Sequence, residues 1–385
     1  MRYLFCLFCV VCSFAGTSQT LSDSASISLM TVVPGEFVYS TFGHSALRVK
    51  DPINRFDRCY NYGTFDFDQP NFLLKFCRGK LLYNLDVESY RSFEYGNLHD
   101  HRPMQEQLLN MNQAQKQRIF DLLQENNKEE NRYYKYDFFY DNCATRIRDI
   151  LQETFTYQLQ FDSSTLPKKA TMRQLLQPYI EDKPWLDFGI DLVLGLPADR
   201  IAKPSDFMFL PDYVHDFFAK AKTGDGIPLV KSERNIPEVL LKKEPFTPSP
   251  LERPFWIMTF VAIIGLISMA NPRTERIFDI LFWFMLGLAG LVIGLLWFAT
   301  DHSATKVNLN ILWAWPTHLL FFWRTRRSGP TGYYFTAAAL TAVLLLIFWK
   351  WIPQEMPTPA LPLIALVMVK GLYRRYWKKE TAELA

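Results

Sequence analysis

The chain has 385 residues, 49% of them apolar and 16% aromatic, which makes it too long and too apolar for a single small soluble domain. Its 42 basic and 39 acidic residues nearly cancel, but the part before Pro254 is slightly acidic and the part after it is basic. Because a nucleic-acid-binding domain concentrates lysine and arginine on its folded part, this distribution excludes DNA and RNA from the expected partners.

Residues 1–16 have the pattern of a secretory signal peptide. Arg2 precedes an apolar run from Leu4 to Val11, and the small residues Ser13 and Ala15 form a cleavage pattern. The run is too short to cross about 30 Å of hydrocarbon at about 1.5 Å per residue, so a first transmembrane helix is the weaker interpretation. The sequence therefore predicts an exported amino-terminal domain.

Export leaves three cysteines, Cys59, Cys77 and Cys143, because the others belong to the signal segment. An odd number allows at most one disulfide within the chain, so at least one thiol stays free. The sequence leaves open whether Cys59 and Cys77 pair.

The expected exported domain, residues 17–241, contains predicted strands followed by predicted helices. Alternating apolar residues predict strands at residues 27–33, 45–49, 58–62 and 81–87. Helical periodicity predicts helices at residues 113–125, 144–153, 171–179 and 206–221, the last capped by Ser205 or Asp206. Strands followed by helices are typical of an α+β domain.

A proline-rich, charged stretch at residues 242–254 predicts a linker. Long apolar runs follow it and predict an all-α, five-helix transmembrane domain at residues 255–377, with a cytoplasmic tail at residues 378–385. The expected spans are residues 255–270, 277–300, 307–323, 333–349 and 360–373.

The charges between these spans predict their orientation. The connections after the first, third and fifth spans carry several arginines each, whereas the opposite connections carry only Lys306 and Lys350. Basic connections stay in the cytoplasm, so the amino-terminal domain is expected in the periplasm and the carboxyl terminus in the cytoplasm. The expected location is the inner membrane, crossed several times.

Cys143 is the first candidate for chemistry. Polar Asp141 and Asn142 precede it, and a helical pattern follows, so the thiol is expected at a helix N-terminus. The unsatisfied N–H groups and the helix dipole at such a position favour a thiolate and can hold an oxyanion. The alternative is a buried structural cysteine.

His44 lies beside Gly43 at the rim of a predicted strand and is the candidate base. A cysteine–histidine pair usually needs a third polar group to orient the imidazole, and Asn61 on the next strand is the candidate, with Asp66 and Asp68 as alternatives. A structural histidine and an ordinary turn asparagine remain possible interpretations.

Seven further polar residues are candidates for binding substrate. Arg146 and Arg148 follow Cys143 on its predicted helix and are suited to a lipid phosphate, although paired surface arginines would look the same. Four other candidates cluster around the connection before the third span. Polar groups at membrane depth usually have a function, although those at the ends of a span can be merely interfacial. The seven are Asn142, Arg146, Arg148, Asp301, His302, Asn308 and Asn310.

The sequence predicts neither a metal nor a cofactor. His99 and His101 lie two residues apart in a polar stretch without a third ligand nearby, which is a weak metal signal. The chain has no glycine-rich phosphate loop after a strand and no GxSxG motif.

Three motifs carry a resemblance to a known family: PGEFVYSTFGHSALRVKDP, YNYGTFDFDQPNFLLKFCRGK and FYDNCATRIRDIL. With the apolar carboxyl-terminal part, they resemble the lipoprotein N-acyltransferases of Bacteroidota, which combine a periplasmic domain with five transmembrane helices. The soluble part is similar to circularly permuted papain-like enzymes, among them the lecithin retinol acyltransferase group. The resemblance implies Cys143 as nucleophile, His44 as base and a third residue from the following strand, for which Asn61 is the candidate.

The resemblance also implies a reaction. An acyl chain would move from a phospholipid donor, through a cysteine thioester, to the α-amino group of the diacylglyceryl-cysteine of a lipoprotein, and both substrates would reside in the lipid bilayer. Two alternatives stay open: a membrane-tethered cysteine peptidase or amidase of the cell wall, and an inactive binding module on a membrane scaffold.

Overall fold

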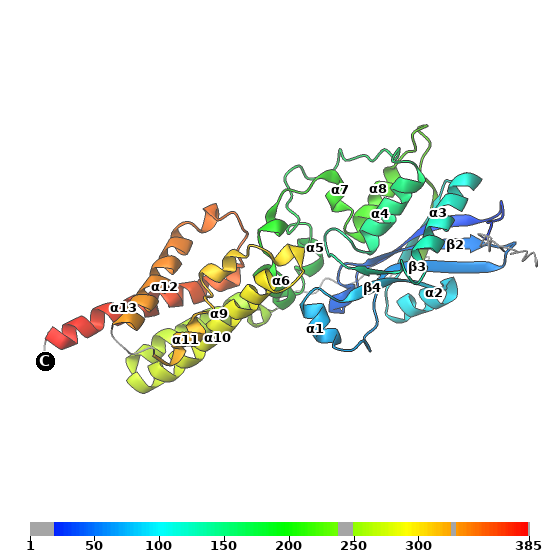
Figure 1. Cartoon of the computed structure of the whole chain (residues 1–385). Helices are drawn as coiled ribbons and strands as arrows, with labels where there is room; N and C mark the ends of the chain where they lie inside the picture. The colour runs from blue at the N-terminus through cyan, green and yellow to red at the C-terminus, as the bar shows by residue number, and fades with distance from the viewer. Residues whose placement is uncertain (1–18, 238–248, 325–328, 384–385) are drawn as a thin grey trace, which may run out of the picture.

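A seven-stranded antiparallel sheet forms the centre of the amino-terminal part of the chain (Figure 1). The computed structural model describes residues 19–237, 249–324 and 329–383. The expected signal peptide, the expected linker up to residue 248, Arg326 and Arg327 lie outside the described residues. The strands, in the spatial order β6-β4-β3-β2-β1-β5-β7, are β1 (Ser26–Val32), β2 (His44–Asp51), β3 (Phe56–Thr64), β4 (Leu82–Ser89), β5 (Met104–Leu109), β6 (Tyr133–Lys135) and β7 (Val230–Ile236).

The register brings several chain segments to one end of the sheet. Val32 at the end of β1 pairs with His44 at the start of β2 and with Met104 at the start of β5. The pairing of β3 with β4 shifts between Asn61 and Thr64, at the same end of the sheet. The opposite end carries the turn between β2 and β3.

Helices cover both faces of the sheet. One face packs against α3 (Gln113–Asn126), α4 (Cys143–Thr154) and α8 (Pro211–Lys220), which lie above the sheet in Figure 1. The other face packs against α2 (Tyr90–His99), whose Phe93 is buried with Met30, Ala46 and Cys59. The strand residues alternate between these two cores, as the period of two in a strand requires.

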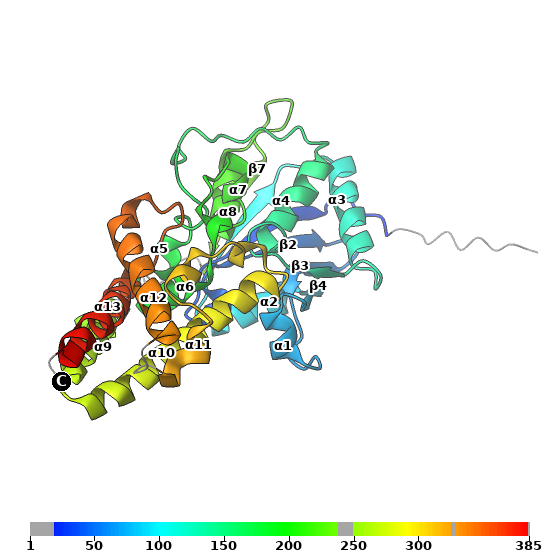
Figure 2. The same ribbon diagram turned by 60° about the vertical axis from the view of Figure 1, so that its left-hand side comes forward.

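The amino-terminal part also contains the short helices α1 (Phe72–Cys77), α5 (Gln177–Ile180), α6 (Pro184–Val193) and α7 (Pro204–Phe207). Both views place α7 beside α8 and α6 between the sheet and the long helices (Figures 1 and 2). α1 lies beside Asp301 of the carboxyl-terminal part, whose backbone N–H donates to the Arg78 carbonyl oxygen.

The carboxyl-terminal part is helical. Its helices are α9 (Pro254–Ile267), α10 (Pro272–Phe298), α11 (His318–Phe321), α12 (Pro330–Ile347) and α13 (Leu361–Glu383). By length and composition, α10 and α12 can each cross a membrane, and Pro254–Ala270 and Thr358–Tyr373 form shorter apolar helices. α13 packs against both α12 and α9.

The expected third span at residues 307–323 is wrong as a continuous helix. The segment consists of 3₁₀ turns at Leu309–Leu312 and Phe322–Arg324 around the single turn of α11. Pro316 lies just before α11 and cannot donate a helical hydrogen bond. The segment packs closely along α10, where a Cβ at Gly290 would collide with the Ala314 carbonyl oxygen.

Two predicted helices of the amino-terminal part are also corrected. Residues 171–179 form turns and only part of α5, because the backbone N–H groups of Met172 and Arg173 donate to Arg200 and Ala198 instead of to a helix. The predicted helix 206–221 is split into α7 and α8, because Pro211 stops one helix and begins the next, and the residue preceding α7 is Lys203 rather than Ser205 or Asp206.

Candidate active site

Cys143 is the first residue of α4, as its sequence surroundings predict. The side-chain Oδ1 of Asn142 accepts hydrogen bonds from the backbone N–H groups of Ala144 and Thr145, both at 2.9 Å. Its Nδ2 donates to the carbonyl oxygens of Phe138 and Phe209, both at 2.8 Å. Asn142 therefore fixes the helix start, and the structure uses its amide for capping rather than for a substrate.

His44 is joined to Asn61 at the ends of β2 and β3. The His44 Nε2 lies 3.3 Å from the Asn61 Oδ1, and the Asn61 Nδ2 donates to Glu88 Oε1 at 2.9 Å. Because Glu88 can only accept from the amide, it turns the Asn61 oxygen toward the imidazole, so His44 carries its proton on Nε2. Nδ1 is then left as an acceptor. Among the three proposed orienting residues, Asn61 makes this contact, whereas the Asp66 carboxylate accepts from the Asp68 backbone.

The backbone around these strand ends brings Cys143 close to the same edge. Gly63, at φ +86°, lies beside the cysteine, and a Cβ at this position would be 3.6 Å from the Cys143 Cβ. The backbone N–H of Ser45, the residue after His44, lowers the pKa of the Cys143 thiol and so favours the thiolate. Gly43 also needs its glycine, because at φ +76° a Cβ would lie 2.8 Å from the Val32 carbonyl oxygen.

Burial dominates the electrostatics of both candidate groups. It raises the pKa of the Cys143 thiol, while the backbone N–H groups of Ser45, Ala144 and Cys143 itself and the Arg102 guanidinium act in the opposite direction. Burial and, second to it, the Arg102 charge lower the pKa of His44 to about 4, while the hydrogen bond to the Asn61 oxygen acts in the opposite direction. At neutral pH His44 is therefore uncharged and able to accept a proton.

Arg102 is a residue of this site that the sequence analysis missed. It lies two residues before Met104, whose partner Val32 also pairs with His44, so it reaches the same end of the sheet. Its Nε donates to the Val33 carbonyl at 3.2 Å, but the buried Nη2 has no hydrogen-bond partner among the residues that the structure describes. A buried, partly unbonded cation beside a thiol is unusual, because such groups cost stability.

The cluster is incomplete as a hydrogen-bonded triad. In the part of the chain that the structure describes, no hydrogen bond joins His44 to Cys143. Catalytic hydrogen bonds are often long without substrate and tighten when it binds. The three cysteines Cys59, Cys77 and Cys143 are all free, and only Cys77 is exposed. Within the described residues, no group of three or more His, Cys, Asp or Glu side chains is placed to hold a metal ion.

The two arginines on α4 are already paired. Arg146 makes a two-pronged ion pair with Asp141 at 2.6 and 2.8 Å and stacks on the Tyr134 ring. Arg148 bonds to Asp149 and to the Ser205 carbonyl oxygen. Within the described residues, no hydrogen bond joins either guanidinium to the cluster around Cys143, and the expected contact with a lipid phosphate stays a prediction.

The four candidates near the third span connect the two parts of the chain. Asp301 pairs with Lys135 at 3.2 Å, and His302 Nε2 donates to the Phe76 carbonyl oxygen at 3.1 Å. The fully buried amides of Asn308 and Asn310 donate to the carbonyl oxygens at the end of α6. The structure thus brings none of the four to Cys143, because their polar groups hold the junction together.

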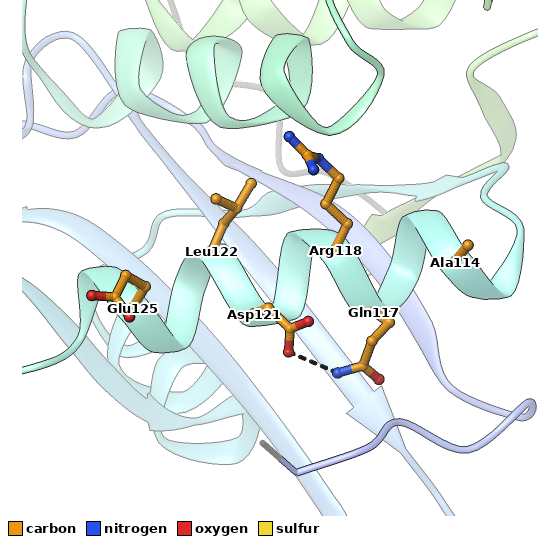
Figure 3. A pocket seen from close by; sticks show the side chains of 6 residues that line it. All are labelled: Ala114, Gln117, Arg118, Asp121, Leu122 and Glu125. Carbon is orange, nitrogen blue, oxygen red and sulfur yellow. Dashed lines mark hydrogen bonds between the residues drawn. The ribbon is translucent and has the colours of Figure 1, made fainter. Parts of the chain in front are cut away.

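Two surface hollows lie away from this cluster. The one in Figure 3, of about 590 Å³, is lined by side chains of α3 alone, with a hydrogen bond from Gln117 to Asp121. The second, of about 940 Å³, is lined in part by Arg148 and Asp149. Neither contains Cys143, His44 or Asn61, so the geometry of the strand ends, rather than a hollow, locates the candidate site.

Two domain families match the chain. The Lnb N-terminal periplasmic domain matches residues 15–178, and the Lnb transmembrane domain matches residues 242–381. No curated protein and no solved structure matches it.

Proposed function

Since the chain belongs to the Lnb family, lipoprotein N-acyltransferases with an N-terminal periplasmic domain and a five-helix transmembrane domain, we propose that it acylates the α-amino group of lipoproteins. The donor is a phospholipid, and the acceptor is the N-terminal diacylglyceryl-cysteine of a lipoprotein. The observation that carries this proposal is the position of Cys143, at the start of α4 and beside the backbone that follows His44.

The soluble part belongs, in this proposal, to the circularly permuted papain-like folds. The strand with His44 precedes the helix with Cys143 in the chain, and α4 packs on β2 and β3. The third residue, Asn61, comes from the strand after His44. This order and packing agree with a permuted arrangement.

In the first half-reaction the Cys143 sulfur attacks the ester carbonyl of the phospholipid. His44 Nδ1 accepts the thiol proton and returns it to the leaving lysophospholipid oxygen, so a C–S bond forms and a C–O bond breaks. Asn61 holds the ring in the required tautomer through Nε2. The N–H groups at the start of α4 are suited to the negative charge that develops on the carbonyl oxygen.

In the second half-reaction the lipoprotein amine attacks the thioester. An α-amino group has a pKa of about 7.7–8.0, so a substantial fraction is neutral at pH 7. His44 accepts the proton that the nitrogen loses, the C–N bond forms, and the C–S bond breaks to restore the thiol. No nucleotide is needed, because a thioester is more reactive than the amide it yields.

Arg102 supports both steps electrostatically. Its cation opposes the burial that raises the pKa of Cys143, so it stabilises the thiolate. The same charge disfavours protonated His44, which keeps the base ready. Arg102 thus acts through the two groups that react.

The proposed location is the inner membrane, with the sheet domain in the periplasm and the carboxyl terminus in the cytoplasm. Two of the connections between helices contact the sheet domain and so lie on its side: Gly195 N–H donates to Ala304, and Gln354 donates to Leu194. Among the described residues, Arg273 and Arg276 lie in the first turns of α10, and Arg324 lies in a turn that packs against α10. Their distance from the two connections agrees with the positive-inside rule.

The test is transfer by the purified protein in phospholipid nanodiscs to a synthetic diacylglyceryl-cysteine peptide. We expect the peptide to gain one acyl chain, which fragmentation places on the α-amino nitrogen, and we expect no gain with Cys143→Ala. A cleaved peptide would instead identify a peptidase. An unmodified peptide with both wild type and variant would support a binding module and contradict acyl transfer.

A further inference from the structure

We propose that the periplasmic domain itself inserts into the surface of the lipid bilayer, through an apolar rim formed by α1 with Phe67 and by the loop at residues 37–39. The inference goes beyond acyl transfer, because it concerns where this domain meets lipid and not what Cys143 does. The membrane-spanning helices anchor the chain, and the rim is a second, separate contact with the membrane.

α1 has the surface of a membrane-contacting helix. None of its residues is buried, although five of the six are apolar in FLLKFC. Leu73 is 70% exposed, and Leu74, Phe76 and Phe67 are exposed as well. A contiguous group of large exposed apolar side chains marks a site that another apolar surface covers.

The loop at residues 37–39 also exposes large apolar side chains, and hydrogen bonds hold its backbone in place. Phe37, Val38 and Tyr39 are exposed, with Val38 at 69%. The Lys183 ammonium donates to the Gly35 carbonyl oxygen and to Thr41 Oγ1, both at 3.1 Å, and so clamps the loop at its two ends. The apolar side chains are therefore held outward.

Both segments lie at the junction with the membrane helices. Asp301 and His302 lie three and four residues beyond the end of α10 at Phe298. The Asp301 N–H donates to the Arg78 carbonyl oxygen just after α1, and the His302 Nε2 donates to the Phe76 carbonyl oxygen within α1. On the other side, Lys183 begins α6, which packs against α9 and α10. Hydrogen bonds and helix packing thus hold both segments of the rim next to the end of the transmembrane region.

The rim also borders the candidate active site. The loop leads directly into His44, and Gly35 at its base packs on Arg102, where a Cβ would lie 3.0 Å from the Arg102 Cδ. α1 follows the end of β3, where Gly63 lies beside Cys143. A rim seated in the bilayer would bring the end of the sheet that carries Cys143 to the lipid surface.

The charges near α1 favour lipid as the occupant. Lys75, Arg78 and Lys80 alternate with the apolar residues of this segment, and anionic headgroups attract basic residues beside inserted apolar ones. Lys75 and Arg78 lie within or directly after a helix that has no buried residue. A bilayer satisfies both the apolar and the basic part of this surface.

Cys77 provides a natural probe of this inference, because it ends α1 and is the exposed one of the three free thiols. We would attach an environment-sensitive fluorophore to Cys77 of the full chain in nanodiscs that contain phospholipid with a spin-label quencher near the headgroup. The control is Ile53→Cys in a Cys77→Ser background, because Ile53 is 69% exposed on the turn at the opposite end of the sheet.

We expect blue-shifted emission at Cys77 and quenching by about half or more, with little quenching of the I53C label. Equal, weak quenching at the two positions would overturn the inference. Blue-shifted emission without lipid quenching would mean that protein covers the rim, for example a second copy, and would overturn it too. The same labelling of Cys143→Ala should give the same result, so a failure of the proposed chemistry stays distinguishable from a failure of this inference.

Discussion

The cluster around Cys143 and the junction between the sheet and the membrane helices are both built from buried polar groups, but they differ in how many of those groups are already bonded. At the junction, Asn308, Asn310 and Gln354 use their amides fully on neighbouring carbonyls, N–H groups and one another. At the cluster, Arg102 Nη2 has no hydrogen-bond partner in the described part of the chain, and His44 Nδ1 is left as an acceptor.

The same contrast appears between two of the buried arginines of the sheet domain, Arg173 and Arg102. Arg173, beside the junction, pairs with both Asp191 and Asp199 at 2.8 Å. Arg102 has no carboxylate partner within the described residues. Satisfied polar groups stabilise a fold, whereas unsatisfied ones cost free energy and persist where another role retains them. The difference supports the proposal that the cluster around Cys143 is reactive and the junction structural.

Removing the nucleophile or its base should give the largest loss of acyl transfer. A smaller loss than at the junction would contradict the contrast between the two clusters. We expect Cys143→Ala and His44→Ala each to lower acyl transfer by about 10³-fold or more, because they remove the nucleophile or its base. Expression and membrane insertion should be unchanged. Cys59→Ala, another buried free cysteine, is the matched control and should retain activity. Full activity of Cys143→Ala or His44→Ala would refute the proposed pair.

Removing the orienting group should cost less. We expect Asn61→Ala to lower single-turnover thioester formation about 10- to 100-fold, because the imidazole still visits the productive pose. Asn61→Asp should retain more activity, since its carboxylate accepts the imidazole N–H. Adding Glu88→Gln should help further, because Asp at 61 would otherwise face the Glu88 carboxylate. A lower thermal midpoint with an unchanged rate would instead make Asn61 a structural turn residue.

Arg102 sharpens the comparison through pH. Its charge lowers the pKa of His44, so Arg102→Met should raise that pKa from about 4 toward its ordinary value. The acid limb of thioester formation should then move to higher pH, and the rate at pH 5 should fall by up to about 10-fold relative to pH 7. Arg102→Lys keeps the positive charge, so the acid limb of its pH profile should stay at the wild-type position. Identical pH profiles for the Met and Lys variants would contradict this role.

Substitutions at the junction should lower the stability of the fold and should have the smallest effect on the rate of thioester formation. Asn310→Ala removes two hydrogen bonds to the α6 carbonyls and the acceptor of the Trp313 Nε1–H, so we expect a loss of about 1–3 kcal/mol in stability. Thioester formation per folded molecule should change less than about 2-fold. Thermal unfolding and single-turnover rates measured on the same preparation test this. A large rate loss at full stability would place Asn310 in the reaction.

Local signals explain what the sequence could predict. The strands β1 to β4 and the helices α3 and α4 follow from periodicity. The position of Cys143 follows from a capping box of Asn142 and Thr145, which lie three residues apart. These features depend on neighbours along the chain, so the sequence displays them directly.

The remainder depends on contacts between distant segments. β7 is mostly exposed and lacks a buried alternating face, so its pairing with β5 has no local pattern. Arg102 and Glu88 join the site only through strand register. The polar groups of Asn308 and Arg146 resemble binding groups in the sequence, because only the fold supplies the carbonyls and the carboxylate that occupy them.

The most direct test of the account is the intact mass of the full-length protein after incubation with phospholipid and without an acceptor. The account predicts a mass gain of one acyl chain on Cys143, which hydroxylamine removes as expected for a thioester and which an acceptor peptide discharges. Cys143→Ala should show no gain. No acyl adduct on the wild type, or an adduct that persists in Cys143→Ala, would contradict the central claim that Cys143 carries the acyl group.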